Sequence, residues 1–254
     1  MMFRPRIIPV LLLKNSGLVK SRKFKDYTYI GDPINAVKIF NELKADELVF
    51  LDITASSENR LISLDFVRNV GEEANMPFAV GGGIRSIDDI RKIISYGAEK
   101  VVIGSYAAEN PKFIKQAVKH FGSSTIVVCI DVKKKFFGGK QVCILNGSKF
   151  TSYNPVEYAK MMEEMGAGEI IIQSVDNDGE MKGYDLELLK SISVEVSIPI
   201  VALGGAGNFN DLKTAFKEAN VTGLAAGSMF VFQGIHRGVL INYPSIQEKL
   251  QIFN

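Results

Sequence analysis

The sequence predicts an α/β fold and, within that class, a (β/α)8 TIM barrel formed by a single domain over residues 1–254. Eight short apolar runs alternate with eight amphipathic segments along the whole chain. The apolar runs are continuous, as in Leu48-Val49-Phe50-Leu51, which is typical of parallel strands buried on both faces. The length of 254 residues also suits eight strand–helix units.

The pattern places each element in chain order. Strands are expected near residues 6–13, 47–53, 77–81, 100–104, 125–131, 169–174, 199–203 and 222–227. Helices are expected near residues 33–44, 61–75, 86–96, 110–121, 154–165, 184–196, 208–219 and 236–250. Helix starts are supported by a capping side chain followed by proline, in Asp32-Pro33, Asn110-Pro111 and Asn154-Pro155.

One segment, near residues 132–152, is too long for a simple barrel loop. It contains Gly138-Gly139 between two strand-like runs, which predicts a hairpin that projects from the catalytic face. Lys133-Lys134-Lys135 leads into this hairpin and is interpreted as a solvated edge, with attraction of phosphate as the alternative.

The composition narrows the class of protein. The net charge of +2 and the absence of interleaved basic and aromatic residues argue against nucleic-acid binding. The apolar run 7–13 is too short to span a membrane and is interpreted as a buried first strand rather than a signal segment. Two cysteines, Cys129 and Cys143, favour a reducing cytoplasm. We expect no metal and no cofactor, with His120 and His236 on helices, where they are either exposed or capping.

The chain also repeats itself. The segments that follow Pro77 and Pro199 are closely similar, and those that begin at Glu47 and Glu169 repeat at the same spacing. This internal similarity predicts two half-barrels of four strand–helix units each.

Glycine clusters follow four of the predicted strands, in two pairs of neighbours. Amides in glycine-rich turns approach phosphate closely, so two clusters at symmetric positions predict a ligand with a phosphate at each end. The alternative is that each glycine only permits a tight turn. The candidate phosphate-binding residues are Gly82, Gly83, Gly104, Ser105, Gly204, Gly205, Gly227 and Ser228.

Acidic residues stand at the same strand ends. Asp131 closes the fifth strand, where its carboxylate is a candidate general acid or base, or else a structural acid that binds loop amides. Asp52 is expected to support loops, whereas Asp178-Gly179 could bind substrate hydroxyls or cap a turn. The first strand has Leu12 at the position that corresponds to Asp131, so one of two possible opposed carboxylates is missing.

Four charged residues stand at the opposite, amino ends of the strands. Arg6, Glu47, Lys100 and Glu169 could form a neutral ring across the barrel floor, because buried charges are costly unless they are paired. Such a ring could be a stabilising plug or a gate for a small neutral molecule.

Segments around these residues resemble the cyclase (synthase) subunit of imidazole glycerol phosphate synthase, the HisF family. The resemblance runs from Arg6 to about Phe232 and is carried by the segments 46–56, 80–85, 166–170 and 204–207. It implies that a glutaminase docks on the barrel floor and that ammonia crosses the barrel to a bis-phosphorylated ribonucleotide at the mouth. The lyase-type cyclase reaction that follows yields imidazole glycerol phosphate for histidine biosynthesis.

The resemblance also assigns residues. The family's ammonia gate matches Arg6, Glu47, Lys100 and Glu169, its loop lysine matches Lys20, and its second catalytic aspartate matches Asp131. The first catalytic aspartate falls on Leu12. Further departures are Gln173 in place of Thr, Leu203 in place of Ser and Gly104 in place of Asn.

These departures leave several functions open. The chain is either a histidine-pathway cyclase or a diverged relative that passes ammonia to a separate amidotransferase making acetamidino groups on surface sugars. A third reading is a non-catalytic scaffold that docks a glutaminase, and a fourth is another phosphate-sugar isomerase of this fold, although Leu12 also argues against an isomerase.

Overall fold

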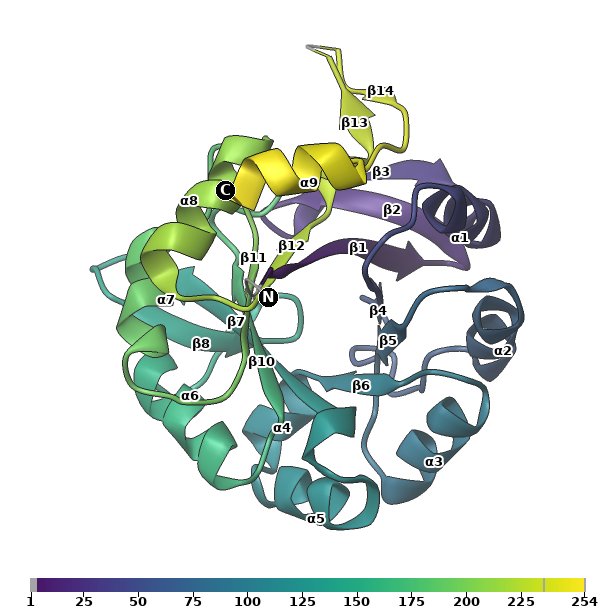
Figure 1. Cartoon of the computed structure of the whole chain (residues 1–254). Coiled ribbons are helices and arrows are strands. Elements are labelled where there is room, and N and C mark those ends of the chain that lie inside the picture. Colours follow the sequence, from purple (N-terminus) through teal and green to yellow (C-terminus); the bar gives the residue numbers. More distant parts are fainter. Residues whose placement is uncertain (1–3, 235, 254) are drawn as a thin grey trace.

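The computed structural model describes residues 4–234 and 236–253, and it confirms the predicted barrel. Eight parallel strands form a closed ring, because the last of them pairs with the first (Figure 1). In order they are β1 (Arg6–Lys14), β4 (Leu48–Asp52), β5 (Phe78–Gly81), β6 (Lys100–Ile103), β7 (Ile126–Lys134), β10 (Glu169–Ser174), β11 (Ile200–Leu203) and β12 (Gly223–Ala226). The origin of the barrel from two half-barrels stays a prediction.

Helices surround the barrel on the outside (Figure 1). They are α1 (Pro33–Glu42), α2 (Leu64–Glu73), α3 (Ile87–Ser95), α4 (Ser105–Glu109), α5 (Lys112–Phe121), α6 (Pro155–Glu164), α7 (Leu186–Ser193), α8 (Phe209–Ala219) and α9 (Ile246–Phe253), with 3₁₀ turns at Ser123–Thr125 and Ser228–Phe230. The Asp32 and Asn154 side chains accept hydrogen bonds from the first turns of α1 and α6, as predicted. Asn110 does not cap α5 and instead follows the last residue of the short helix α4. No described helix is long and apolar enough to cross a lipid bilayer.

Two hairpins extend from the carboxyl ends of barrel strands. One lies within the segment 132–152: β8 (Lys140–Ile144) pairs antiparallel with β7 and continues to β9 (Lys149–Phe150). The other was not predicted, because no strand was expected between residues 14 and 32. It consists of β2 (Gly17–Arg22), which pairs antiparallel with β1, and β3 (Lys25–Gly31).

The helix predicted over residues 236–250 is wrong over most of its length. The chain first forms a small hairpin of β13 (Phe232–Gln233) and β14 (Gly238–Val239), and α9 starts only at Ile246. The backbone amides of Leu240 and Asn242 bond to carbonyl groups of the 3₁₀ turn region, which holds this stretch extended. His236 consequently lies in a turn, whereas His120 lies on α5, and both are exposed.

The interior of the barrel is an apolar core separate from the core beneath the helices. It is built from alternate residues of each strand, since successive side chains of a strand point to opposite faces. The buried members are Ile8, Val10, Val49, Ala79, Val102, Val127, Ile171, Val201, Leu203 and Ala225. This apolar interior lies between charged groups at the amino ends of the strands and a cavity at their carboxyl ends.

Candidate functional site

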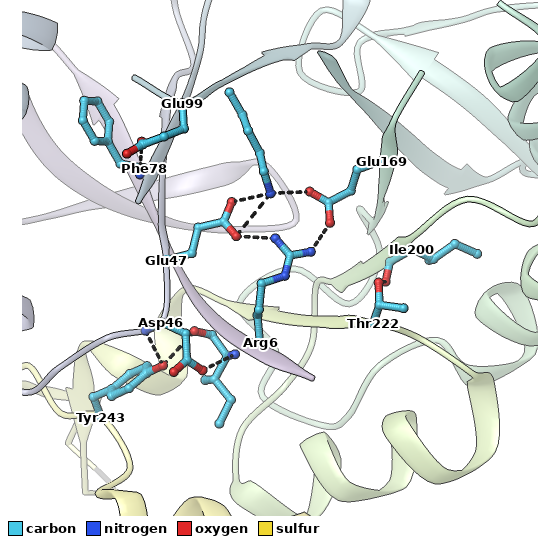
Figure 2. Close-up of polar contacts among 11 residues, drawn as sticks. Arg6, Asp46, Glu47, Phe78, Glu99, Glu169, Ile200, Thr222 and Tyr243 are labelled. Atoms are coloured by element: carbon cyan, nitrogen blue, oxygen red, sulfur yellow. Dashed lines mark hydrogen bonds and ion pairs between the residues drawn. The ribbon is translucent and has the colours of Figure 1, made fainter. Parts of the chain in front are cut away.

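The four predicted floor residues meet in one closed ring of ion pairs (Figure 2). Arg6 donates to Glu47 and to Glu169 through different guanidinium nitrogens. Lys100 closes the ring from the other side, with its Nζ 3.1 Å from Glu47 Oε1 and 2.9 Å from Glu169 Oε2. The predicted neutral ring is therefore present, with each carboxylate shared between two cations.

Burial and pairing oppose each other in this ring. The two glutamate side chains are almost fully buried, while those of Arg6 and Lys100 keep partial contact with solvent. Burial alone would lower the pKa of Arg6, but Glu169 and Glu47 raise it overall, so the guanidinium stays charged. Partial exposure of the cations keeps the desolvation cost of the ring moderate.

Contacts next to the ring hold the start of β1, which carries Arg6, in place. Asp46, next to Glu47, accepts a hydrogen bond from the Ile7 amide at 2.9 Å and forms an ion pair with Lys249 at 2.9 Å. The Tyr243 hydroxyl donates to the Ile7 carbonyl at 2.8 Å and accepts from the Asp46 amide. The C-terminal segment thus fixes the floor.

At the opposite end a cavity opens among the carboxyl ends of the strands. It collects most of the predicted site residues, together with residues of the β2–β3 hairpin. The predicted residues that line it are Lys20, Gly82, Gly83, Gly104, Ser105, Asp131, Asp178, Gly227 and Ser228, and Leu12, Gln173 and Leu203 line it as well. Gly179, Gly204 and Gly205 lie outside this lining.

Asp131 faces the cavity from the end of β7. Its nearest polar side-chain partner is the Cys129 thiol, 3.7 Å from Oδ1. The pKa of Asp131 is raised to about 7 overall: burial raises it most, the hydrogen bond from the Cys129 thiol lowers it, and the negative charge of Asp178 raises it. A carboxyl group with that pKa can both release and take up a proton near neutral pH.

Lys20 reaches the cavity from β2, and its side chain is buried. The ammonium donates to the Val10 carbonyl and lies beside Gly227, where Nζ would be 2.9 Å from an added Cβ. Burial lowers the pKa of Lys20 to about 7, with Asp178 acting in the opposite direction. Among the described residues Lys20 forms no ion pair within 4 Å.

Asp178 holds the β2–β3 hairpin against the mouth. Its carboxylate accepts from the Ser21 hydroxyl at 2.6 Å and from the Phe24 amide at 3.4 Å. Gly179 packs beneath the same hairpin, since an added Cβ would lie 2.1 Å from the Ser21 carbonyl. Asp178 therefore lines the cavity and anchors a loop, while Gly179 serves close packing.

The glycine turns differ in what surrounds them, and the turn after β5 is as tightly packed as the turn after β11, since an added Cβ at Gly83 would lie 1.8 Å from the Arg60 carbonyl oxygen. Gly104 lines the cavity and an added Cβ would meet nothing closer than 3.7 Å. Gly204 and Gly205 have positive φ angles of +93° and +112°, and an added Cβ would come within 2.5 Å and 2.1 Å of neighbouring carbonyl oxygens. The β11 glycines are thus required by tight loop packing, whereas the β6 turn is open to the cavity.

Two further acids act as loop supports. Asp52 forms a forked ion pair with Arg60, at 2.6 Å and 3.2 Å, and accepts from the Thr54 and Ala55 amides, as the sequence predicted. Asp176 accepts from the Lys134 amide at 2.7 Å. Arg60 had not been singled out, because it lies in a loop with no motif of its own.

A sequence profile described as histidine biosynthesis protein matches residues 6–236 of the chain. The chain belongs to the HisF family of histidine biosynthesis proteins. The imidazole glycerol phosphate synthase subunit HisF of Streptococcus mutans is 42% identical over 229 residues, which cover 90% of this chain and 91% of that protein. The predicted resemblance is confirmed.

Other HisF relatives are somewhat more similar. A HisF protein of Leptospira borgpetersenii is 46% identical over 99% of this chain and 100% of its own length. The hisF3 protein of Vibrio vulnificus is also 46% identical, over 98% of this chain and 96% of its own length. The names of these two proteins mark their assignment to imidazole glycerol phosphate synthase as provisional.

Proposed function

We propose that this protein is the barrel subunit of a glutamine-dependent ammonia-transfer system. In this proposal a glutaminase docks on the floor, and ammonia passes the ring of Arg6, Glu47, Lys100 and Glu169 and crosses the barrel to the mouth. The observation that carries the proposal is the closed ring over an apolar interior that leads to a cavity. An apolar passage favours neutral ammonia over ammonium, because desolvating a charge is far more costly.

We further propose that the chemistry at the mouth has diverged from that of the cyclase. Leu12 lines the cavity at the position of the family's first catalytic aspartate, and an isobutyl group cannot transfer a proton. Gln173 and Leu203 also replace smaller polar residues of the family in that lining. Names such as hisF2 of Pseudomonas aeruginosa, which is 45% identical, are consistent with additional members of the family. On this reading the ammonia goes to a separate amidotransferase, for example one that forms acetamidino groups on sugars.

The second candidate function is the histidine-pathway cyclase itself. It is favoured by Asp131 and Lys20, two groups with pKa values of about 7 in one cavity, and by the open glycine turn at Gly104. A cyclase of this kind would work with one carboxylate. Loss of a group that acts in proton transfer typically costs on the order of 10²–10⁴ in rate.

The two candidates are separated by a cyclase assay with the purified chain, its genomically neighbouring glutaminase and the bis-phosphorylated ribonucleotide. We expect glutamine hydrolysis without formation of imidazole glycerol phosphate. Brisk product formation by the unaltered protein would overturn the divergence. If the unaltered protein lacks cyclase activity mainly because of the missing carboxylate, Leu12→Asp should gain about 10²-fold in that activity. Leu12→Asn is the matched control, because asparagine has the shape of aspartate but cannot ionise. It should gain no cyclase activity.

A further inference from the structure

The tip of the β7–β8 hairpin exposes two large aromatic side chains that the proposed function does not use. Phe136 and Phe137 are 94% and 96% exposed. Their rings pack edge to face with centroids 5.0 Å apart. Most exposed apolar side chains are scattered singly, so a pair of adjacent, nearly bare phenylalanines is the informative case.

The hairpin presents these rings on a well-defined turn. The Lys135 amide donates to the Gly139 carbonyl at 3.0 Å, and the Gly138 amide donates to the Lys135 carbonyl at 3.2 Å. Gly138 and Gly139 have φ angles of +89° and +76°, which glycine adopts without strain. The backbone is therefore fixed in a conformation that directs both rings outward.

The base of the hairpin belongs to the mouth. Asp131, which lines the cavity, pairs in register with Cys143 of β8, and Asn146 beyond β8 also lines the cavity. The Lys134 amide is held by Asp176 at 2.7 Å. At ~3.3 Å per residue, the tip lies roughly 15 Å along the strand from Asp131. In Figure 1 the hairpin extends outward from β7 past the helices α6 and α7.

A basic groove continues from the tip to the helices. Lys134, Lys135 and Gly138 line it on the hairpin side, and Val156 and Leu188 line it on the side of α6 and α7. Lys140 in the same groove forms ion pairs with Asp185 at 2.8 Å and with Glu187, which also lines the groove, at 3.1 Å. Lys134 and Lys135 form no ion pair within residues 4–234 and 236–253, so their charge remains available to a partner.

We propose that this surface, the tip Phe136–Phe137 with Lys134 and Lys135, docks the enzyme that accepts the ammonia. The inference rests on the proposed function. Ammonia released into water near neutral pH becomes ammonium, which is not a nucleophile, so the acceptor enzyme must cover the mouth while ammonia leaves it. A surface at the rim, rigidly joined to the cavity wall, suits that geometry. The partner offers an apolar pocket for the two rings, rimmed by acidic side chains that face the lysines.

The partner is identified by a photo-cross-link from the tip in the native host. The photoreactive p-benzoylphenylalanine replaces Phe137, and a chain that carries it instead at Val194, an exposed residue at the opposite end of α7, is the control. We expect a cross-link, specific to position 137, to an amidotransferase that consumes ammonia. No position-specific cross-link, or one to a protein that takes no ammonia, overturns the proposal.

The cross-linked enzyme is then purified and titrated with variants. F136S/F137S should weaken its binding at least about tenfold, whereas V194S/I246S, two other well-exposed apolar residues, should not. Transfer of ¹⁵N from amide-labelled glutamine should fall in parallel while glutamine hydrolysis continues. Equal binding by F136S/F137S and wild type overturns the docking surface.

Two further outcomes are decisive. Binding to vesicles of phosphatidylglycerol and phosphatidylcholine that is lost in F136S/F137S would show a membrane-binding hairpin and overturn the proposal, because lysine and aromatic side chains also suit an anionic bilayer. Normal binding of the acceptor enzyme without any ¹⁵N transfer in wild type would keep the docking surface and overturn the ammonia conduit instead.

Discussion

The floor and the mouth of this barrel both carry ionisable side chains with little access to water. Those at the floor form ion pairs with one another, whereas Asp131 and Lys20 at the mouth do not. At the floor, Glu47 and Glu169 are each shared between two cations, and the four charges sum to zero. At the mouth, the half-buried Asp131 and the buried Lys20 have no ion-pair partner among the described residues, and desolvation is the main cause that moves the pKa of each to about 7.

The difference separates a part in which the charges compensate one another from a part in which two unpaired groups titrate near neutral pH. In the ring each charge has a partner, and removing either partner leaves the other uncompensated. Unpaired buried groups titrate near neutrality and can exchange protons with a ligand, which is how sites for proton transfer are commonly arranged. Four substitutions test this contrast.

The largest effect is expected at the floor. Glu169→Gln keeps the shape of the side chain but leaves two cations facing one carboxylate, so the free energy of unfolding should fall by about 3 kcal/mol. Urea denaturation at pH 7.5 measures it. The double variant E169Q/K100M restores neutrality and should recover at least half of the loss. If E169Q changed the free energy of unfolding by less than about 0.5 kcal/mol, the four charges would not stabilise one another in the way proposed.

Asp131→Asn should change the pH dependence of stability at the mouth. The pKa of Asp131 is about 7 in the folded protein and about 3.9 in an unfolded chain, so between these values the folded state keeps a proton that the unfolded state has released. Wild-type stability from this group is present below about pH 4 and is lost as pH rises towards 7. The variant should lack this decline and gain about 2 kcal/mol at pH 8.

Denaturation at pH 4, 6 and 8 gives the comparison for Asp131. Asp65→Asn, which alters an exposed carboxylate on α2, is the matched control and should follow wild type at every pH. If the free energy of unfolding of D131N changed with pH in the same way as that of the wild type, Asp131 would not be the group with the raised pKa.

Lys20→Met should produce a smaller effect of the opposite sign. The pKa of Lys20 is about 7 in the folded protein and about 10.4 in an unfolded chain, so between these values the folded state has released a proton that the unfolded state still holds. This group makes wild-type stability rise with pH between 7 and 10, and the variant should lose about 1 kcal/mol of that rise. Thermal or urea unfolding at pH 7 and 9 measures it, with the exposed Lys25→Met as control.

The smallest effect is expected at an ion pair on the rim of the mouth. Arg60, whose side chain is 40% exposed, pairs with Asp52. Arg60→Met should cost about 0.5 kcal/mol at low salt and less in 1 M NaCl, since exposed pairs are weak and screened. Arg60→Lys keeps the charge but not the fork, so an unaltered stability in that variant would indicate that charge alone matters. If Arg60→Met lowered the free energy of unfolding as much as Glu169→Gln does, the ion pairs at the two ends of the barrel would not differ in strength.

The sequence predicts the barrel well because each strand is a continuous apolar run bounded by turn residues. It misses the β2–β3 hairpin, since Lys25–Gly31 is mostly exposed and lacks apolar alternation, and its pairing depends on β1 and on Asp178 from a distant loop. It also extends the last helix too early, because the residues around Leu240 are held extended by bonds to Val231 that no local pattern reveals.

The candidate site is predictable to a similar degree. The positions of Arg6, Glu47, Lys100 and Glu169 at strand starts are enough to predict the ring, because strand direction alone brings them to one end. The glycines are harder: the same residue type is open to the cavity at Gly104 and packed against a carbonyl at Gly205. Which of these occurs depends on neighbouring loops that are distant in the chain, so the sequence alone does not distinguish them.

The partners of the floor ring lie far apart in the chain, and this has a consequence for synthesis. Arg6 and Glu169 are 163 residues apart, and Tyr243, which bonds to the Ile7 carbonyl, is 236 residues from it. As the chain emerges from the ribosome, β1 has no neighbour on one edge until β12 and the C-terminal segment are made. The nascent chain therefore exposes an apolar strand edge for most of its translation, and chaperones that cover such edges should determine its yield.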